Sequence, residues 1–239
     1  MKKRIWELDA LRGLCVLGMV VIHFLYDLID LHRLVDWNYP PVFLFVRQWG
    51  GVLFLLISGI CVTLGRHCIK RGLLVFACGL VCTAVTYGMY HFNMAGKGII
   101  IYFGVLHCLG VCMLLWPLFR KLPHWALGLV GLLLVGIGFY FRSIPPVEYP
   151  YLIPLGIVQE NFVSSDYFPI LPNLGFFLLG SALGKSVYRS KESLLPKVNS
   201  RNAIIRFFLL CGKHSLWIYL LHQPLLNGIF YLYFFFQAN

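Results

Sequence analysis

The chain has 239 residues, of which 59% are hydrophobic and only 12% are charged. Soluble domains average about 45–50% apolar and about 25% charged residues, so this composition excludes a soluble protein and a soluble domain with one anchor. The formal net charge of +11 could suit a nucleic-acid ligand. The cations gather in alternate loops between apolar stretches, however, so we attribute the charge to membrane topology and expect no nucleic-acid partner.

Seven apolar stretches follow one another along the chain, each close to the roughly 20 residues that cross a bilayer. They predict an all-α polytopic membrane protein, with about seven transmembrane helices in a single domain over residues 1–239. The stretches lie at 11–31, 42–64, 71–91, 99–118, 124–142, 168–187 and 214–236.

The loops on one side of these helices are basic, and those on the other side are not. The second side has four cations, Arg33, Arg47, Lys97 and Arg142. The first side carries Lys2, Lys3, Arg4, Arg12, Arg66, Lys70, Arg71, Arg120, Lys121, Lys185, Arg189, Lys191, Lys197, Arg201, Arg206 and Lys213. Cytoplasmic loops are enriched in Lys and Arg, so we predict that the N-terminus lies in the cytoplasm and the C-terminus outside.

Residues 9–30, read as one helix that enters the first predicted span, place five ionisable side chains on one face, Asp9, Arg12, His23, Asp27 and Asp30. Arg12 and His23 differ by only about 20° around the helix and lie about 16 Å apart along it. Ionisable residues inside a membrane span are costly and are functional by default. Asp27, one turn beyond His23, can orient its imidazole. A purely structural alternative makes Asp9 and Arg12 an interfacial pair and His23 an interhelical hydrogen-bonding group.

Three further segments hold candidate residues. In the fourth predicted helix, His107 lies between Gly104 and Gly110, so it can approach a neighbouring backbone closely. In the last predicted helix, three polar side chains share one face at i, i+4 and i+7, namely Ser215, Tyr219 and His222. Asp166, just before the sixth stretch, is either a helix N-cap or an outer-face ligand. His32, in the first outer loop, is a weaker candidate.

Two loop segments are expected to lie along the membrane surface. Segment 149–158, in the Pro-rich outer loop 143–167, is too short to span and predicts a re-entrant or interfacial element. Residues 203–211 predict an amphipathic interfacial helix. The eight cysteines all lie in predicted helices or on the cytoplasmic side, where thiols stay reduced, so we expect neither disulfides nor a metal site.

Five ordered motifs resemble the heparan-alpha-glucosaminide N-acetyltransferase-like proteins, the bacterial relatives of an animal lysosomal enzyme. The motifs are Leu8-Asp9-Ala10-Leu11-Arg12-Gly13 with Met19 and His23, Leu56-Ile57-Ser58-Gly59, Phe103-Gly104-Val105-Leu106-His107, Asp166-Tyr167-Phe168-Pro169-Ile170-Leu171-Pro172, and His214-Ser215-Leu216-Trp217-Ile218-Tyr219-Leu220-Leu221-His222-Gln223-Pro224. An Arg followed by ten residues and a His, as in Arg12 and His23, is also similar to the first-helix motif of the acyltransferase-3 family.

The resemblance implies an acyl-CoA-dependent O- or N-acyltransferase in a bacterial plasma membrane. Such proteins take an acetyl group from cytoplasmic acetyl-CoA and give it to a hydroxyl or amine of a sugar in the cell envelope. In the animal enzyme the position of His23 looks like an Asn, and the proposed catalytic His lies in the following outer segment, where this chain offers His32. The position of His107 looks like a Gln there, which favours a hydrogen-bonding role.

The residues fit acyl transfer through their own chemistry as well. His23 can act as a base or as a transient acyl carrier, with Asp27 orienting it and His32 as the alternative. His107 and His222 are expected to line a tunnel. Asp166, Ser215 and Tyr219 are expected on the acceptor side. Six residues at the cytoplasmic face are expected to bind CoA, namely Asp9, Arg12, Arg66, Lys70, Arg71 and Lys213.

Two other function classes remain open on the residues alone. Intramembrane His, Arg and Asp also mark pathways for an anion or another polar solute in transporters and channels. A haem or quinone redox protein could use His23, His107 and His222. Direct transfer and an acyl-His path, O- and N-acylation, and a monomer or a homodimer all fit this sequence.

Overall fold

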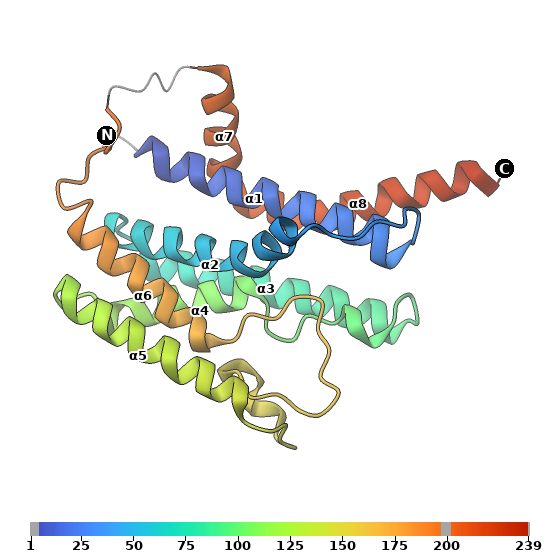
Figure 1. Ribbon diagram of the computed structural model, residues 1–239, viewed down its shortest axis with the longest axis horizontal. Coiled ribbons are helices and arrows are strands. Elements are labelled where there is room, and N and C mark those ends of the chain that lie inside the picture. The colour runs from blue at the N-terminus through green and yellow to red at the C-terminus, as the bar shows by residue number, and fades with distance from the viewer. Residues whose placement is uncertain (1–4, 197–201, 239) are drawn as a thin grey trace. The chain divides into compact units, whose positions relative to one another are not determined.

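The computed structural model describes residues 5–196 and 202–238, and within this part of the chain every regular element is a helix (Figure 1). The nearest approach to sheet in these residues is an isolated parallel bridge between Phe103 and Tyr167. The all-α prediction is therefore confirmed. Five of the cations assigned to the cytoplasmic side lie outside the described residues, namely Lys2, Lys3, Arg4, Lys197 and Arg201.

Eight α-helices and three short helical turns follow one another in the described residues. The first half contains α1 (Trp6–Tyr26), the π-helical turn η1 (Asp27–Leu31), α2 (Pro41–Leu64), α3 (Cys68–His91), the 3₁₀ turn η2 (Lys97–Ile99) and α4 (Val105–Phe119). The second half contains α5 (His124–Ser143), the 3₁₀ turn η3 (Pro150–Leu155), α6 (Ile170–Ser186), α7 (Ala203–Lys213) and α8 (Ser215–Ala238).

Four helical segments of the described chain are long and apolar enough to cross a membrane, Trp6–Leu31, Pro41–Leu64, Cys68–His91 and His124–Ser143. The pair α7 and α8 passes the same test together, although the two helices are bent by 84°. These helices support an integral membrane protein. The predicted number of about seven spans, and the predicted topology, stay predictions.

The fourth and sixth predicted spans are shorter than expected. Helix α4 has 15 residues. The chain before it is extended and pairs with the segment before α6 through a hydrogen bond of 2.9 Å from Phe168 N–H to the Phe103 carbonyl. Helix α6 has 17 residues, and Leu171 near its start has non-helical backbone angles. Pro172 explains this break, because a proline disfavours the α-helical conformation of the residue before it.

Both segments predicted to lie along the membrane surface contain a short helix, and their place at that surface stays a prediction. Segment 150–155 is the 3₁₀ turn η3, which is too short to cross a membrane. Residues 203–213 form α7, so the helix predicted for 203–211 is confirmed, while its place at a membrane surface stays a prediction. Its N-cap is Asn202, whose side chain accepts a hydrogen bond of 2.9 Å from Ile204 N–H.

The chain divides into two compact units, residues 1–54 with 192–239 and residues 55–191. We call them unit 1 and unit 2. In unit 1, α1 crosses α7 at direct backbone contact (Figure 1). A Cβ on Gly13 would overlap the Phe208 carbonyl oxygen, and a Cβ on Gly212 would overlap the Asp9 carbonyl oxygen. Small residues that let two backbones touch are typical of membrane helix pairs.

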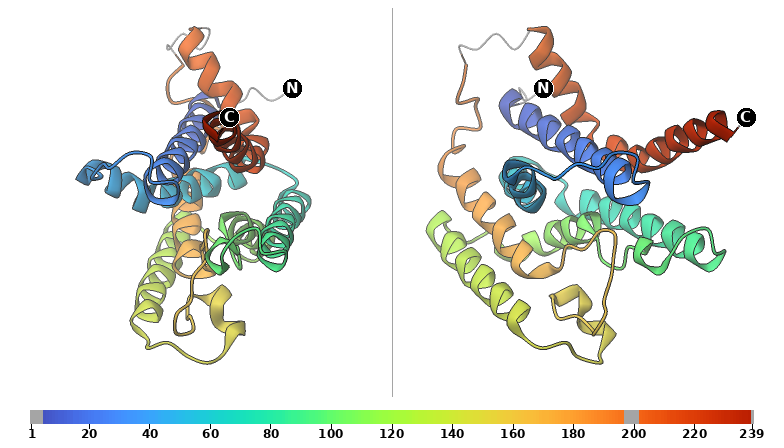
Figure 2. Two further views of the ribbon diagram at one scale, coloured as in Figure 1. Left: turned by 90° about the vertical axis from the view of Figure 1, so that its right-hand side faces the viewer. Right: turned by 45° about the vertical axis from the view of Figure 1, so that its right-hand side comes forward.

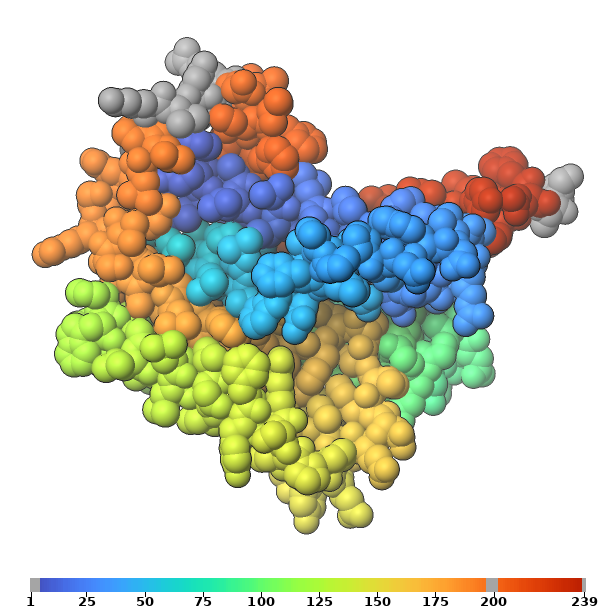
Figure 3. Space-filling model, viewed as in Figure 1, coloured from blue at the N-terminus to red at the C-terminus, as the bar shows by residue number. Residues whose placement is uncertain are grey.

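Unit 2 is built from two helix pairs, α3 with α4 and α5 with α6 (Figure 2). The second part of α2 contacts α6, where the Ser181 hydroxyl donates a hydrogen bond of 3.1 Å to the Gly59 carbonyl. Helix α5 lies at the surface in the space-filling view (Figure 3) and exposes a row of large apolar side chains, Trp125, Leu129, Leu132, Leu133 and Tyr140. Such an apolar outer face fits contact with lipid chains.

The backbone crossing of α1 and α7 gives a stability test with a control on the same helix. Gly13→Ala places a methyl group against the Phe208 carbonyl, and we expect overpacking to lower the free energy of unfolding by about 1–3 kcal/mol. A methyl group on Gly18 would meet no other atom within 4 Å, so Gly18→Ala should be neutral, or stabilising by up to about 1 kcal/mol. Thermal unfolding in detergent compares the two, and equal melting temperatures would contradict the crossing.

Candidate active site

Two histidines meet in unit 1, one from α1 and one from α8. The ring centroids of His23 and His222 are 4.9 Å apart, with an edge-to-face angle of 67°. Each ring is tied to its own helix through Nδ1, at 2.9 Å from the Met19 carbonyl for His23 and at 2.5 Å from the Tyr219 carbonyl for His222. A carbonyl oxygen can only accept, so Nδ1 carries the hydrogen in both rings, and Nε2 holds the lone pair of each neutral ring.

The Nε2 atom of His222 is buried and has no hydrogen-bond partner among the described residues. Buried polar atoms in proteins are nearly always hydrogen-bonded, so such an atom calls for an explanation. In this tautomer Nε2 is an acceptor and a base. The pair therefore offers a basic nitrogen that can take a proton from a ligand, or attack an electrophilic carbon.

A carboxylate and an amide meet one turn further along the same two helices. Asp27, which is only 1% exposed, accepts hydrogen bonds of 3.1 and 3.3 Å from Gln223 Nε2. An ionised carboxylate has no hydrogen to give, so the amide nitrogen of Gln223 must face it. The amide oxygen then points elsewhere, and it too is buried without a partner among the described residues.

Within the described chain, the structure shows no hydrogen bond between the Asp27 carboxylate and the His23 ring, although the sequence predicted a direct contact. The hydrogen bonds of the Asp27 carboxylate go to Gln223, and the Met19 carbonyl orients His23. Asp27 still lies within electrostatic range of the imidazoles of both His23 and His32. The π-helical turn η1 begins at Asp27 and so changes the direction of the side chains that follow. Such turns are frequent at functional sites.

His32 follows this turn and lies at the same end of unit 1. Its backbone N–H donates to the Asp27 carbonyl at 2.9 Å, and its ring packs on Phe230 and Phe234 at centroid distances of 4.6 and 5.2 Å. Its Nε2 atom is also buried without a partner among the described residues. Both alternative catalytic histidines therefore remain candidates.

The cations expected to bind CoA fall into two groups. In unit 1, Arg12 lies 3.8 Å from Asp9, and Gly212 packs on the Asp9 backbone, so that Lys213 follows directly at the same crossing. The other three belong to unit 2, where Arg66, Lys70 and Arg71 are exposed around the short turn between α2 and α3. Of the expected acceptor-side residues, Ser215 opens α8, and the Tyr219 ring lies 5.6 Å from that of His222.

His107 and Asp166 come together in unit 2, at the start of α4. His107 is 2% exposed and accepts a hydrogen bond of 3.2 Å at Nδ1 from Gly104 N–H. Its Nε2 lies 3.4 Å from the Thr83 hydroxyl, which itself donates to the Ile101 carbonyl at 2.6 Å. Both ring nitrogens therefore have partners.

Asp166 accepts a hydrogen bond of 3.0 Å at Oδ2 from Val105 N–H. It therefore caps α4, and not the helix α6 that follows it in the chain. The electrostatic reason is that carboxylates are favourable beside the free N–H groups at a helix N-terminus.

Gln223 belongs to a motif that the sequence singles out, but the sequence pattern assigned it no role. The available signal was an amide in the middle of an apolar helix, directly after His222, in a chain whose first helix carries a carboxylate. In the described residues, no cluster of three or more His, Cys, Asp or Glu side chains could hold a metal ion.

Comparisons with known proteins bear on this arrangement. A family model described as heparan-alpha-glucosaminide N-acetyltransferase, catalytic, matches residues 4–224. The matched range includes all of unit 2 and most of unit 1, and it ends directly after Gln223, at Pro224. Searches of curated proteins and of solved structures each gave no match. Because the family model covers nearly the whole chain and includes every candidate residue described above, this chain belongs to the heparan-alpha-glucosaminide N-acetyltransferase family.

Proposed function

We propose that this membrane protein transfers an acetyl group from cytoplasmic acetyl-CoA to a hydroxyl or amine of a carbohydrate at the outer face of a bacterial plasma membrane. The observation that carries the proposal is the His23–His222 pair, in which both Nδ1 atoms are held by backbone carbonyls and the Nε2 of His222 is buried without a partner in the described chain. Membership of an acetyltransferase family supports it.

Acyl transfer needs a base or a nucleophile of this kind. In direct transfer, Nε2 of His23 removes the proton from the acceptor hydroxyl or amine, which attacks the thioester carbon. The carbon–sulfur bond breaks, and the CoA thiolate takes up a proton. In the two-step route, Nε2 of His23 attacks the thioester carbon, the carbon–sulfur bond breaks, and the CoA thiolate takes up the proton that the acetylated ring gives up. The acceptor then attacks the acetyl-imidazole, the carbon–nitrogen bond breaks, and the imidazole takes the acceptor's proton.

Asp27 and Gln223 support either route through charge and orientation. When His23 takes a proton it becomes a cation, and a buried carboxylate within electrostatic range stabilises that cation. Gln223 holds this carboxylate in place with two contacts from one amide nitrogen. The free oxygen of the same amide can accept a hydrogen bond from the acceptor substrate.

The cytoplasmic end of α1 supplies the proposed donor site. Guanidinium and ammonium groups bind phosphates through charge-assisted hydrogen bonds, and Arg12 and Lys213 lie together at the crossing of α1 and α7. Ten residues of helix lie between Arg12 and His23, so the helix rises by about 16 Å from one to the other, and the pantetheine arm would extend along this length. Arg66, Lys70 and Arg71 of unit 2, on the basic side of the sequence, stay candidates for further phosphate contacts.

The choice between the two candidate bases is open to direct test. We expect His23→Ala to reduce acetyl transfer by at least about 100-fold, the lower range for loss of a general base or acid. His32→Ala should keep activity within several-fold of wild type. Transfer is measured with labelled acetyl-CoA and a glucosamine acceptor, on protein shown to fold by thermal unfolding. The reverse pattern would assign catalysis to His32.

Binding of acetyl-CoA tests the donor site separately from chemistry. In calorimetry on the detergent-purified protein, we expect Arg12→Ala to weaken acetyl-CoA binding by about tenfold, equivalent to about 1.4 kcal/mol for the loss of one phosphate contact. His23→Ala should bind acetyl-CoA as wild type does, because His23 is proposed to contact the thioester and not the phosphates. If wild type binds no acyl-CoA, solute transport becomes the better explanation for the polar residues of α1.

His107 should act as part of the scaffold. His107→Ala leaves the Gly104 N–H and the Thr83 hydroxyl without their ring partner, and one such buried loss costs about 1–3 kcal/mol. We therefore expect a lower melting temperature, with turnover per folded molecule within several-fold of wild type. A protein of unchanged stability that has lost turnover would instead place His107 in the catalytic machinery.

A further inference from the structure

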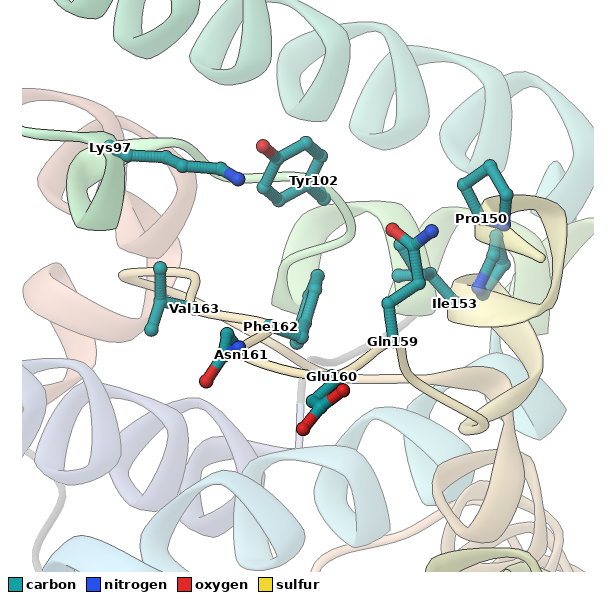
Figure 4. Close-up of a pocket in the computed structure, with 10 residues that line it drawn as sticks. Lys97, Tyr102, Pro150, Ile153, Gln159, Glu160, Asn161, Phe162 and Val163 are labelled. Carbon is teal, nitrogen blue, oxygen red and sulfur yellow. The ribbon is translucent and has the colours of Figure 1, made fainter. Parts of the chain in front are cut away.

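Unit 2 contains a pocket of about 250 Å³ between the segment around η2 and the loop that carries η3 (Figure 4). Six of the side chains at its walls carry polar or aromatic groups, namely Lys97, Tyr102, Gln159, Glu160, Asn161 and Phe162. Figure 4 shows Lys97 and Tyr102 on one side and Gln159, Glu160, Asn161 and Phe162 on the other. No residue of the proposed donor and histidine sites lines this pocket.

The walls of the pocket are held by hydrogen bonds that do not involve a ligand. Val147 N–H donates to the Val158 carbonyl at 3.0 Å, and the Gln159 amide nitrogen donates to the Glu148 carbonyl at 2.8 Å. These contacts close the loop on itself. A pocket whose walls are already fixed loses little conformational entropy when it binds a ligand.

A second set of bonds ties the loop to the segment before α4. Ser164 donates to the Ile100 carbonyl at 2.9 Å, and Ser165 donates to the Ile99 carbonyl at 2.6 Å. Within the loop itself, the Tyr167 hydroxyl donates to the Ile153 carbonyl at 2.7 Å. Burial raises the pKa of Tyr167 to about 12, so its hydroxyl stays protonated and keeps donating at neutral pH. The pocket is therefore an ordered feature of unit 2.

The chemistry of the lining restricts the ligand class. One ammonium, on Lys97, and one carboxylate, on Glu160, balance each other, so the pocket favours a ligand without net charge. Amide, hydroxyl and carboxylate groups offer both donors and acceptors for many hydroxyl groups. Sites for drug-sized ligands typically have volumes of about 300–1,000 Å³. The pocket is smaller than this range, and it is therefore too small for a nucleotide.

An aromatic surface completes the pocket. The rings of Tyr102 and Phe162 lie 5.6 Å apart at 45°, and Tyr102 is 37% exposed. The face of an aromatic ring carries partial negative charge, which attracts the weakly positive C–H groups on the face of a sugar ring. Balanced charges, small volume, mixed polar groups and an accessible ring all fit the same ligand.

We propose that this pocket binds one ring of a neutral saccharide, with the sugar face on Tyr102 and the sugar hydroxyls on Lys97, Glu160 and Asn161. The pocket would give the protein a saccharide contact in unit 2, apart from the histidines of unit 1. If that saccharide is the acetyl acceptor, the inference rests on the proposed function. The acceptor is then an oligosaccharide, because one ring binds in unit 2 and another ring receives the acetyl group. Binding itself requires no acetyl transfer.

The test measures saccharide binding to the full-length protein in lipid nanodiscs, because detergents with sugar headgroups would compete. Calorimetry with cellotetraose should give binding to wild type that Tyr102→Ala weakens at least tenfold, whereas Tyr102→Phe, which keeps the ring, should lose less than threefold. Tyr151→Ala is the matched control, since Tyr151 is 69% exposed on the same loop but outside the pocket lining. A tetramer of galacturonate, which is anionic, should bind more weakly than cellotetraose.

Two outcomes would overturn the proposal. One is no measurable binding of cellotetraose to wild type at millimolar concentration, and the other is equal loss in Tyr102→Ala and Tyr151→Ala. The His23→Ala protein keeps this test separate from the proposed function, because it should bind cellotetraose as wild type does. Tyr102-dependent binding without any acetyl transfer by wild type would support the pocket and reject the acyltransferase. Acetyl transfer by wild type without Tyr102-dependent binding of cellotetraose would support the acyltransferase and reject the saccharide pocket.

Discussion

The contact of α1 with the bent pair α7 and α8 is the constraint on which the chemistry of unit 1 depends. Near its start, α1 touches the backbone of α7 through Gly13 and Gly212. Nearer its end, its ionisable residues meet side chains of α8. One helix can reach both partners because α7 and α8 are bent by 84°. The close crossing and the polar contacts are thus two parts of one packing arrangement.

This arrangement also explains how a nearly fully buried carboxylate is tolerated in such an apolar chain. A buried charge without partners is strongly unfavourable, so Asp27 needs hydrogen-bond donors close by. Gln223 supplies them from α8, and the π-helical turn that begins at Asp27 lets the chain leave the helix directly afterwards. The Gln223 amide nitrogen holds the Asp27 carboxylate in place, so the amide oxygen of Gln223 must point away from that carboxylate. The site therefore presents this amide oxygen as a hydrogen-bond acceptor in a fixed position.

The sequence predicted those features that follow from local pattern. Long apolar helices and the polar face of α1 could be derived from residue spacing. The contact between His23 and His222 could not, because the pattern on one helix does not say which other helix faces it. The length of α4 could not be derived, because the residues before it are apolar yet pair with a distant loop. For Asp166 the sequence left a helix N-cap and an outer-face ligand open, and it could not show the hydrogen bond from Val105 N–H, because Val105 lies 61 residues earlier in the chain. Gln223 was passed over because its partner, Asp27, is nearly two hundred residues away.

The three helical histidines show why residue type alone does not assign a role. In His107, Nδ1 accepts from a backbone N–H, so Nε2 of the neutral ring carries the hydrogen and donates to Thr83. In His23 and His222, Nδ1 faces a backbone carbonyl, so Nε2 of the neutral ring holds the lone pair. A base or a nucleophile needs that lone pair directed away from the backbone. The difference between a scaffold histidine and a reactive one therefore lies in which backbone group faces Nδ1, and in this chain that separates His107 from the pair in unit 1.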